Sequence, residues 1–314
     1  MEKQLLDEVI ACLPESRTLF HYHRDRYTLY LLDRLCRHGQ LRTIADIKRS
    51  PYVGWLEKPL LKNVTAALGR ADVPVQVLLD QARFSVPSNP YVLTLGQWGS
   101  EERSSWYQTS RPGLNLVLHL NLPLFHIGKL AALGIRDVSD LQFCCHPNDR
   151  KRITLAWARI DLDFATGEAL IEEIQSDWTR EIAWLFRRAH EARKNGKQQV
   201  GWWGGKPLSI SQLLDYEQSL RLQFKLWSEA MLTAALWFLL DELGMREVFY
   251  HSWQTGMAVK RMQGSGPPRS LYGELPERFA FKPCDHGPEF LENTGKLKRI
   301  RKQQHEWLWY HWAA

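Results

Sequence analysis

The chain has 314 residues, of which 44% are hydrophobic, so it can form one large domain or two ordinary ones around a real core. Its 14 Trp and formal net charge of +6 favour an anionic partner, such as nucleic acid or a phosphorylated ligand. Five cysteines without framework spacing, no signal-peptide pattern and no apolar run of about 18 residues predict a cytoplasmic protein without disulfides or a membrane span.

The first 86 residues are predicted to form a helical, basic region. Leu5, Leu6 and Val9 have helical spacing, and Pro14 ends that run. Further helices are expected over residues 19–35, 56–68 and 73–84, where apolar residues recur every three or four positions. Arginines are frequent here, so the region either contacts an anionic partner or is a solvated basic surface.

Four short apolar runs follow this region, at residues 91–95, 115–121, 154–161 and 169–174. Each run is bounded by Gly, Pro, Asn or Asp, which is the punctuation typical of strands. Residues 162–168 read as a hairpin loop, so the last two strands should be antiparallel.

The second half of the chain returns to helical spacing after residue 178 and again over residues 209–244. A strand is expected over residues 247–253, then a short helix over 256–262 and a last short strand near residue 281. The predicted fold class is therefore α+β, with packed helices on a mixed, largely antiparallel sheet. We expect three parts: a helical N-terminal region (1–86), an α+β core domain (87–292) and a basic, aromatic C-terminal tail (293–314).

The most informative segment, residues 169–178, begins as an apolar strand and ends in several closely spaced polar residues. Alternate side chains of a strand share a face, so Glu173, Gln175 and Asp177 should point one way and Glu172 the other. An unpaired buried carboxylate is costly. We therefore expect this strand end to open into a cleft, or its carboxylates to be bound by donors.

Two interpretations of these carboxylates stay open. In the first, Glu173 or Asp177 is a catalytic acid or base and Gln175 binds the substrate. In the second, Asp177 caps the following helix and Glu173 pairs with a buried arginine such as Arg159. In both, replacing Asp177 should harm the protein more than replacing Glu172.

A second candidate group follows the strand at residues 247–253. If that strand runs parallel to residues 169–174, His251 comes close to Asp177 and Glu173, within about 8 Å, with Tyr272 arriving from the next loop. We expect His251 and Tyr272 to be catalytic, Gln254 to bind substrate, and the nearby carboxylate to raise the pKa of His251. The alternative is a histidine whose hydrogen bonds are satisfied inside the core.

The polar segment at residues 107–115 offers further donors. Ser110, Arg111 and Asn115 are predicted to bind a phosphate or carboxylate of the substrate, since arginine offers a bidentate fork. The alternative is a plain hairpin connection. We expect no metal site, because the chain lacks a Cys-x-x-Cys pair.

The last 22 residues combine cations with aromatic rings, the combination that binds nucleic acid through phosphates and stacked bases. The predicted nucleic-acid-binding residues are Lys296, Lys298, Arg299, Arg301, Lys302 and Trp307. A terminal helix that docks its Trp side chains into the core would have the same composition, so both interpretations stay open.

The order of elements resembles the GCN5-related N-acetyltransferase fold. The closing segment, residues 271–281, resembles the end of such domains, with Tyr272 before a "leucine-proline" strand and Ala280 in place of the usual glycine. The resemblance implies acyl-coenzyme A, with its pyrophosphate at the helix after the fourth strand. The family's glycine-rich cofactor loop is absent before the buried helix expected over residues 209–244, so the cofactor is left unassigned.

A more local resemblance involves residues 173–178, Glu-Ile-Gln-Ser-Asp-Trp. They resemble a motif of domains in the polyvalent proteins of phages and mobile elements, and the likeness extends over about residues 91–281. It implies a phage, antiviral defence or mobile-element role. Two functions are therefore expected: an acyltransferase-like enzyme, or a nucleic-acid-binding protein on the same scaffold without group transfer.

Overall fold

The computed structural model describes residues 1–12, 17–68, 73–83, 88–100, 107–203, 205–260, 266–292, 294–302 and 308–313. They form an eight-stranded mixed sheet with packed helices and a separate two-stranded ribbon. The predicted α+β class is therefore confirmed.

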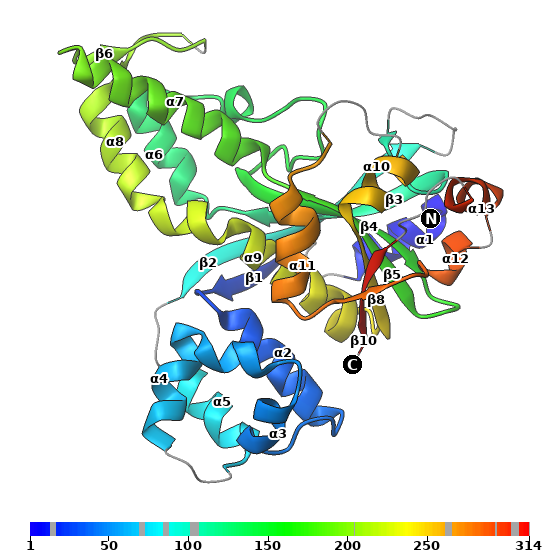
Figure 1. The fold of residues 1–314 in the computed structure, drawn as a ribbon. Helices are drawn as coiled ribbons and strands as arrows, with labels where there is room; N and C mark the ends of the chain where they lie inside the picture. Colours follow the sequence, from blue (N-terminus) through cyan, green and yellow to red (C-terminus); the bar gives the residue numbers. More distant parts are fainter. Residues whose placement is uncertain are drawn as a thin grey trace.

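The strands of the main sheet are β1 (Arg17–Tyr22), β2 (Asn89–Ser100), β3 (Gly113–Asn121), β4 (Thr154–Asp163), β5 (Glu168–Gln175), β8 (Glu247–His251), β9 (Lys282–Cys284) and β10 (Trp309–Ala313). Their spatial order is β1-β2-β3-β4-β5-β8-β10-β9 (Figure 1). Every neighbouring pair is antiparallel except β5 and β8, which run parallel as predicted. The ribbon pairs β6 (Gln199–Val200) with β7 (Leu208–Ser209).

The helices fall into three groups along the chain (Figure 1). Before β2 they are α1 (Lys3–Ala11), α2 (Arg26–Arg37), α3 (Ile44–Arg49), η2 (Val53–Glu57), α4 (Pro59–Leu68) and α5 (Val75–Arg83). From β3 to β8 they are α6 (Phe125–Leu133), η4 (Val138–Leu141), α7 (Asp177–Lys194), α8 (Ile210–Ser219), α9 (Arg221–Trp237) and η5 (Phe238–Glu242). After β8 they are α10 (Trp253–Lys260), η6 (Ser270–Glu274), α11 (Leu275–Arg278), α12 (Glu289–Glu292) and α13 (Gly295–Arg301).

The two faces of the main sheet differ in character. Leu95, Leu118, Ala158 and Ile174 lie opposite one another on β2, β3, β4 and β5. This apolar face packs against α9, whose second half is buried on nearly every side. The side chains of the intervening positions point to the other face, which is largely polar in these four strands. We call this the polar face, and it carries the candidate site.

Residues 17–22 are a strand, whereas the sequence predicts a helix over residues 19–35. β1 pairs with the edge of β2 from Arg17 opposite Thr94 to Tyr22 opposite Asn89, and α2 begins only at Arg26. The helical spacing of apolar residues was misleading here, because pairing with a long neighbouring strand satisfies the backbone groups of this short segment.

Residues 309–313 are an inner strand of the sheet and not part of a free tail. β10 pairs with β8 on one side and with β9 on the other. Trp309 and Trp312 are 0% and 3% exposed, so they belong to the core. Because β1 and β10 lie outside residues 87–292, the sheet combines strands from all three of the expected parts.

Candidate functional site

A row of polar and aromatic side chains crosses the polar face. Thr94 on β2 is opposite His119 on β3, which is opposite Trp157 on β4, which is opposite Gln175 on β5. Cross-strand neighbours share a face, so these four side chains form one continuous row. At its end, β5 gives way to α7 and to Asp177.

Asp177 gathers four donors although its side chain is 1% exposed. Its Oδ2 accepts hydrogen bonds from Nδ1 of His146 at 2.8 Å and from Nε1 of Trp157 at 3.1 Å. Its Oδ1 accepts from Gln175 at 2.5 Å and from Arg180 at 2.8 Å. Burial alone would raise the pKa of Asp177, but these hydrogen bonds, led by that of His146, lower it. The carboxylate is therefore ionised at neutral pH.

The helix after the motif is capped by Ser176 and not by Asp177, so the capping interpretation of Asp177 is wrong. The hydroxyl oxygen of Ser176 accepts a hydrogen bond from the backbone N–H of Thr179. Asp177 is the first residue of α7, where the helix dipole favours a negative charge. With the cap supplied by its neighbour, the Asp177 side chain is free to bind His146.

His146 lies in the connection between η4 and β4 and is half-buried, with 30% of its side chain exposed. The rings of Phe143, Trp157 and Trp98 lie 5.2, 5.8 and 6.5 Å from its centroid. Nδ1 contacts Asp177, whereas Nε2 has no hydrogen-bond partner within the described part of the chain. The ring is thus fixed at one nitrogen and available at the other.

Glu173 forms the buried ion pair that the structural interpretation predicts. Its Oε2 accepts from Nη2 of Arg159 at 2.5 Å and lies 3.7 Å from Nζ of Lys260. Arg159 also donates to the carbonyl oxygens of Tyr107 and Gln108. Gln108 has a φ of 52°, a left-handed conformation that is uncommon outside glycine and that lets both carbonyls face Arg159.

Glu172 does not point away from this cluster, because β5 contains a bulge at that residue. Arg159 is opposite Glu173 and Ile160 is opposite Ile171, which leaves Glu172 as the extra residue of β5. Its carboxylate accepts from the backbone N–H of Ser110 at 2.9 Å and from the Ser110 hydroxyl at 2.8 Å. Glu172 therefore binds the segment at residues 107–110 directly, and Glu173 is linked to it through Arg159.

His251 pairs with Glu172, whereas the sequence predicts Asp177 or Glu173 as its partner. Nε2 of His251 lies 3.3 Å from Oε2 of Glu172 and 2.9 Å from the Ser110 hydroxyl, and Nδ1 lies 3.1 Å from the hydroxyl of Thr255. The parallel pairing of β5 and β8 places Glu172 beside His251, because Ile171 is opposite Tyr250. Since the His251 side chain is 0% exposed, its hydrogen bonds are satisfied inside the protein.

The pKa of His251 is lowered, so the predicted rise is wrong. Burial is the main cause and outweighs the opposing effect of the Glu172 carboxylate. Burial would raise the pKa of Glu172, but the hydrogen bond with His251 and the charges of Arg159 and Lys260 lower it to about 2. A neutral His251 that donates from Nε2 and accepts from Thr255 at Nδ1 satisfies these contacts.

Lys260 and Tyr272 fill the place where β5 and β8 stop pairing. Nζ of Lys260 donates to the backbone carbonyl of Glu172 at 2.9 Å and to the Tyr272 hydroxyl at 2.8 Å, and both side chains are buried. Lys260 thus replaces the strand partner that Glu172 lacks, and two buried cations, Arg159 and Lys260, balance two buried carboxylates. Tyr272 is held as a hydrogen-bonding group in this core.

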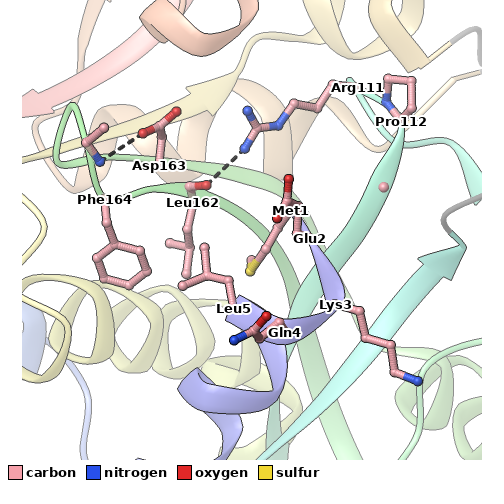
Figure 2. Close-up of a pocket in the computed structure, with 12 residues that line it drawn as sticks. Met1, Glu2, Lys3, Gln4, Leu5, Arg111, Pro112, Leu162, Asp163 and Phe164 are labelled. Atoms are coloured by element: carbon pink, nitrogen blue, oxygen red, sulfur yellow. Dashed lines mark hydrogen bonds between the residues drawn. The ribbon is translucent and has the colours of Figure 1, made fainter.

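Of the residues predicted in the segment at 107–115, only Ser110 joins the cluster. Arg111 donates to both carboxylate oxygens of Asp161, at 2.6 and 3.0 Å, and to the carbonyl of Leu162. It lines a pocket of about 800 Å³ beside Met1 (Figure 2). Asn115 is 1% exposed, and its Oδ1 has no hydrogen-bond partner among the residues that the structure describes.

Among the remaining predicted residues, those that the structure describes form no hydrogen bond or ion pair with this cluster. Gln254 is half-buried in the first turn of α10. Lys296 lies in α13, and Lys298, Arg299, Arg301 and Lys302 are exposed there or just after it. Arg301 is engaged by Glu292 at 3.0 Å. Trp307 is outside the described residues.

The N-terminus of α7 does not fit the pyrophosphate of acyl-coenzyme A. The acetyltransferase resemblance places that group at the helix after the fourth predicted strand (residues 169–174), which is β5 in the structure, so that the helix is α7. Its first residue is the ionised Asp177, already bound by His146 and Arg180. A pyrophosphate would face this carboxylate at the position where the helix dipole would otherwise attract it.

The row of polar residues also makes the stability of the protein depend on pH. Burial lowers the pKa of His119 to about 4, and His119 is 5% exposed. In the unfolded chain His119 is protonated below a pKa of about 6.5, whereas in the folded chain it stays neutral down to about pH 4. The free energy of unfolding therefore falls as the pH drops from about 6.5 to 4. Protonation of this residue should lower the free energy of unfolding by up to about 3 kcal/mol over this pH range. Urea denaturation at several pH values measures it.

The variant His119→Gln should flatten this pH dependence, whereas His190→Gln should not, since His190 is exposed on α7 and pairs with Glu217. Equal slopes for all three proteins between pH 6.5 and 4 would contradict a neutral, buried His119. Glu172 affects stability only at lower pH. A carboxylate whose pKa is lowered in the folded protein loses its contribution to the free energy of unfolding only below about pH 4.5.

Two central residues were not predicted as site residues. Lys260 ends a short helix and reads as an ordinary solvated lysine, and His146 lies 31 positions before Asp177. The sequence around His146, Cys-Cys-His-Pro-Asn-Asp, is rich in polar and turn-forming residues and could have marked it. Nothing in that pattern indicates Asp177 as its partner.

No protein-family model, curated protein or solved structure matches this chain. Within the described residues, no helix is long and apolar enough to cross a membrane. Any function proposed for the chain therefore rests on the geometry of the polar face.

Proposed function

We propose that this chain is an enzyme in which His146, oriented by Asp177, is the general base or acid of a hydrolysis or group-transfer reaction. The observation that carries the proposal is the 2.8 Å contact between Nδ1 of His146 and the buried carboxylate of Asp177. When Nδ1–H donates to that carboxylate, the lone pair lies on Nε2. A ring held in this way can take a proton from a nucleophile and return it to a leaving group.

The surroundings of His146 suit a small polar substrate. Aromatic rings of Trp98, Phe143 and Trp157 flank the imidazole and limit its contact with water. The guanidinium of Arg180 lies 5.3 Å from the centre of the Phe143 ring and is 55% exposed. This cation can bind an anionic group of the substrate beside the imidazole.

The buried cluster around Glu172 supports the site in this proposal but does not perform chemistry. Glu172 and His251 are 0% exposed, and Tyr272 is 1% exposed, so a substrate has no surface to contact there. Glu172 and His251 hold the segment that contains Ser110. Tyr272 binds Lys260, and Glu173 holds Arg159. Glu173, His251 and Tyr272, predicted as catalytic, become positioning residues, and Asp177, predicted as the acid or base itself, orients the base instead.

The variants His146→Gln and Asp177→Asn test the proposal. Each should lower the activity by about 10²- to 10⁴-fold, because the proton carrier or its fixed tautomer is lost. The assay is a panel of chromogenic esters, amides, phosphodiesters and glycosides. A second measurement needs no substrate: the rate at which diethyl pyrocarbonate acylates His146. Asp177→Asn should slow this acylation several-fold.

His190→Gln is the matched control, because His190 also contacts a carboxylate, Glu217, at 2.7 Å, but on the exposed surface of α7 and α8. It should leave both activity and folding unchanged. If an activity of the intact protein survives in His146→Gln, or if the acylation of His146 is indifferent to Asp177→Asn, the proposed role of the pair is refuted.

Nucleic-acid binding is the second candidate, favoured by the exposed cations of α13. Within the described residues, Lys298 and Arg299 have no carboxylate at ion-pair distance. Lys298→Glu with Arg299→Glu should weaken binding to a DNA or RNA oligonucleotide and reduce its salt slope by about two. An unchanged slope would exclude α13 as the binding surface. A phage or mobile-element setting stays a prediction from the motif resemblance.

A further inference from the structure

A pocket of about 320 Å³ lies between β1, α2 and α9, near the end of α5. Its main lining residues are Phe20, His23, Arg26, Tyr30, Thr233 and Trp237. Phe20 is opposite Tyr91 on β2, and odd-numbered residues of β2 such as Leu95 face α9. The pocket therefore opens on the apolar side of the sheet, away from His146.

Arg26 is the only lining cation, among the described residues, without a carboxylate partner. Arg83, also in the lining, lies 3.5 Å from Asp33 and 3.6 Å from Asp80. The guanidinium of Arg26 lies over the Phe20 ring, 5.4 Å from its centroid, and has no hydrogen-bond or ion-pair partner in the part of the chain that the structure describes. Burial lowers the pKa of Arg26, as expected for a charge taken from water without compensation.

The walls beside this cation are aromatic. The rings of Phe20 and Trp237 are 6.3 Å apart at their centroids and tilted by 38°. Leu29 and Tyr30 continue the wall along α2, on the same helix face as Arg26. Burial lowers the pKa of His23, so this histidine adds no second charge at neutral pH. The lining also contains a carboxylate, Asp33, which is paired with Arg37 and Arg83. The pocket thus offers one uncompensated cation beside flat apolar surfaces.

We propose that this pocket is a binding site for a small aromatic anion, a molecule that joins a flat ring to a carboxylate or a phosphate. Arg26 would bind the anionic group through its fork, and the ring would pack on Phe20 and Trp237. The volume lies within the lower range of natural ligand pockets. The pocket lies on the other side of the sheet from His146, so this ligand would be distinct from the substrate of the proposed reaction.

Isothermal titration calorimetry of the full chain tests this with three probes. Naphthalene-2-carboxylate and adenosine 5′-monophosphate carry the two anionic groups, and neutral naphthalene-2-carboxamide carries neither. We expect at least one anion to bind with a dissociation constant below about 1 mM, and at least about tenfold more tightly than the amide. Which of the two binds identifies the carboxylate or the phosphate class.

Arg26→Gln should raise the dissociation constant of the anion by about tenfold or more, and Trp237→Leu should raise it as well. Arg24→Gln is the matched control: it removes the same charge two residues earlier, from an exposed side chain. If Arg26→Gln lowers the helix content in circular dichroism, its weaker binding reflects misfolding. The affinity of Trp237→Leu and the comparison of the anion with the amide then decide whether the pocket binds the anion. Absence of binding by both anions, equal binding of the amide, or equal affinities of the Arg24 and Arg26 variants would overturn the proposal.

Discussion

A chain shortened to end at Asn293 should fail to fold. It lacks β10, the strand that joins β8 to β9 inside the sheet. It also lacks Trp309 and Trp312, which are 0% and 3% exposed. Burial of two Trp side chains contributes on the order of 10 kcal/mol, which is as large as the whole stability of a typical domain. Far-UV circular dichroism and urea denaturation would show the loss of cooperative unfolding.

Removal of Ala313 and Ala314 alone is the control, since it shortens β10 by one exposed residue and keeps both Trp side chains. That protein should unfold cooperatively, close to the stability of the intact chain. If the chain ending at Asn293 unfolds in the same way, the strand is dispensable. Because the deletion removes core residues, it cannot report on nucleic-acid binding, which requires charge reversal on α13.

Glu172→Gln should destabilise the protein by about 3–5 kcal/mol, the cost of removing one partner from a buried ion cluster. Glu172 is 0% exposed and accepts hydrogen bonds from the N–H and the hydroxyl of Ser110. Its loss leaves Arg159 and Lys260 buried with only Glu173 to balance them. Urea denaturation at pH 7 measures the change in the free energy of unfolding.

The ranking expected from the sequence, in which replacing Asp177 harms the protein more than replacing Glu172, stays a prediction that the same measurement on Asp177→Asn would test. Glu191→Gln is the control, because Glu191 is exposed on α7 and its replacement should change stability by less than about 0.5 kcal/mol. A Glu172→Gln protein as stable as the Glu191 variant would show that the cluster around Lys260 contributes nothing to folding.

The middle of the fold was predictable because its strands have local signals. Residues 154–175 form the expected antiparallel hairpin, and β8 runs parallel to β5 across a long helical connection. β1 and β10 were missed for a different reason. Each is short, and its strand conformation depends on partners 25 or more residues away, so the local pattern of apolar residues does not determine it.

The site was only partly predictable, for an equally physical reason. The period of two correctly joins Glu173 with Gln175, but it fails at Glu172, because a bulge depends on the register of β5 against β4. Asp177 was identified from its polar surroundings. Its partner His146 lies in an irregular connection, where no periodicity indicates which way a side chain points.

The balance of charges around Lys260 constrains how such a sequence can change over time. Two cations and two carboxylates share one buried volume, and replacement of any one of them by a neutral residue leaves a net charge without solvent. Evolution can replace these residues without a loss of stability only in pairs, one cation together with one carboxylate. In an alignment of descendants, Lys260 and Glu173 should therefore covary, and each should be invariant wherever the other is kept.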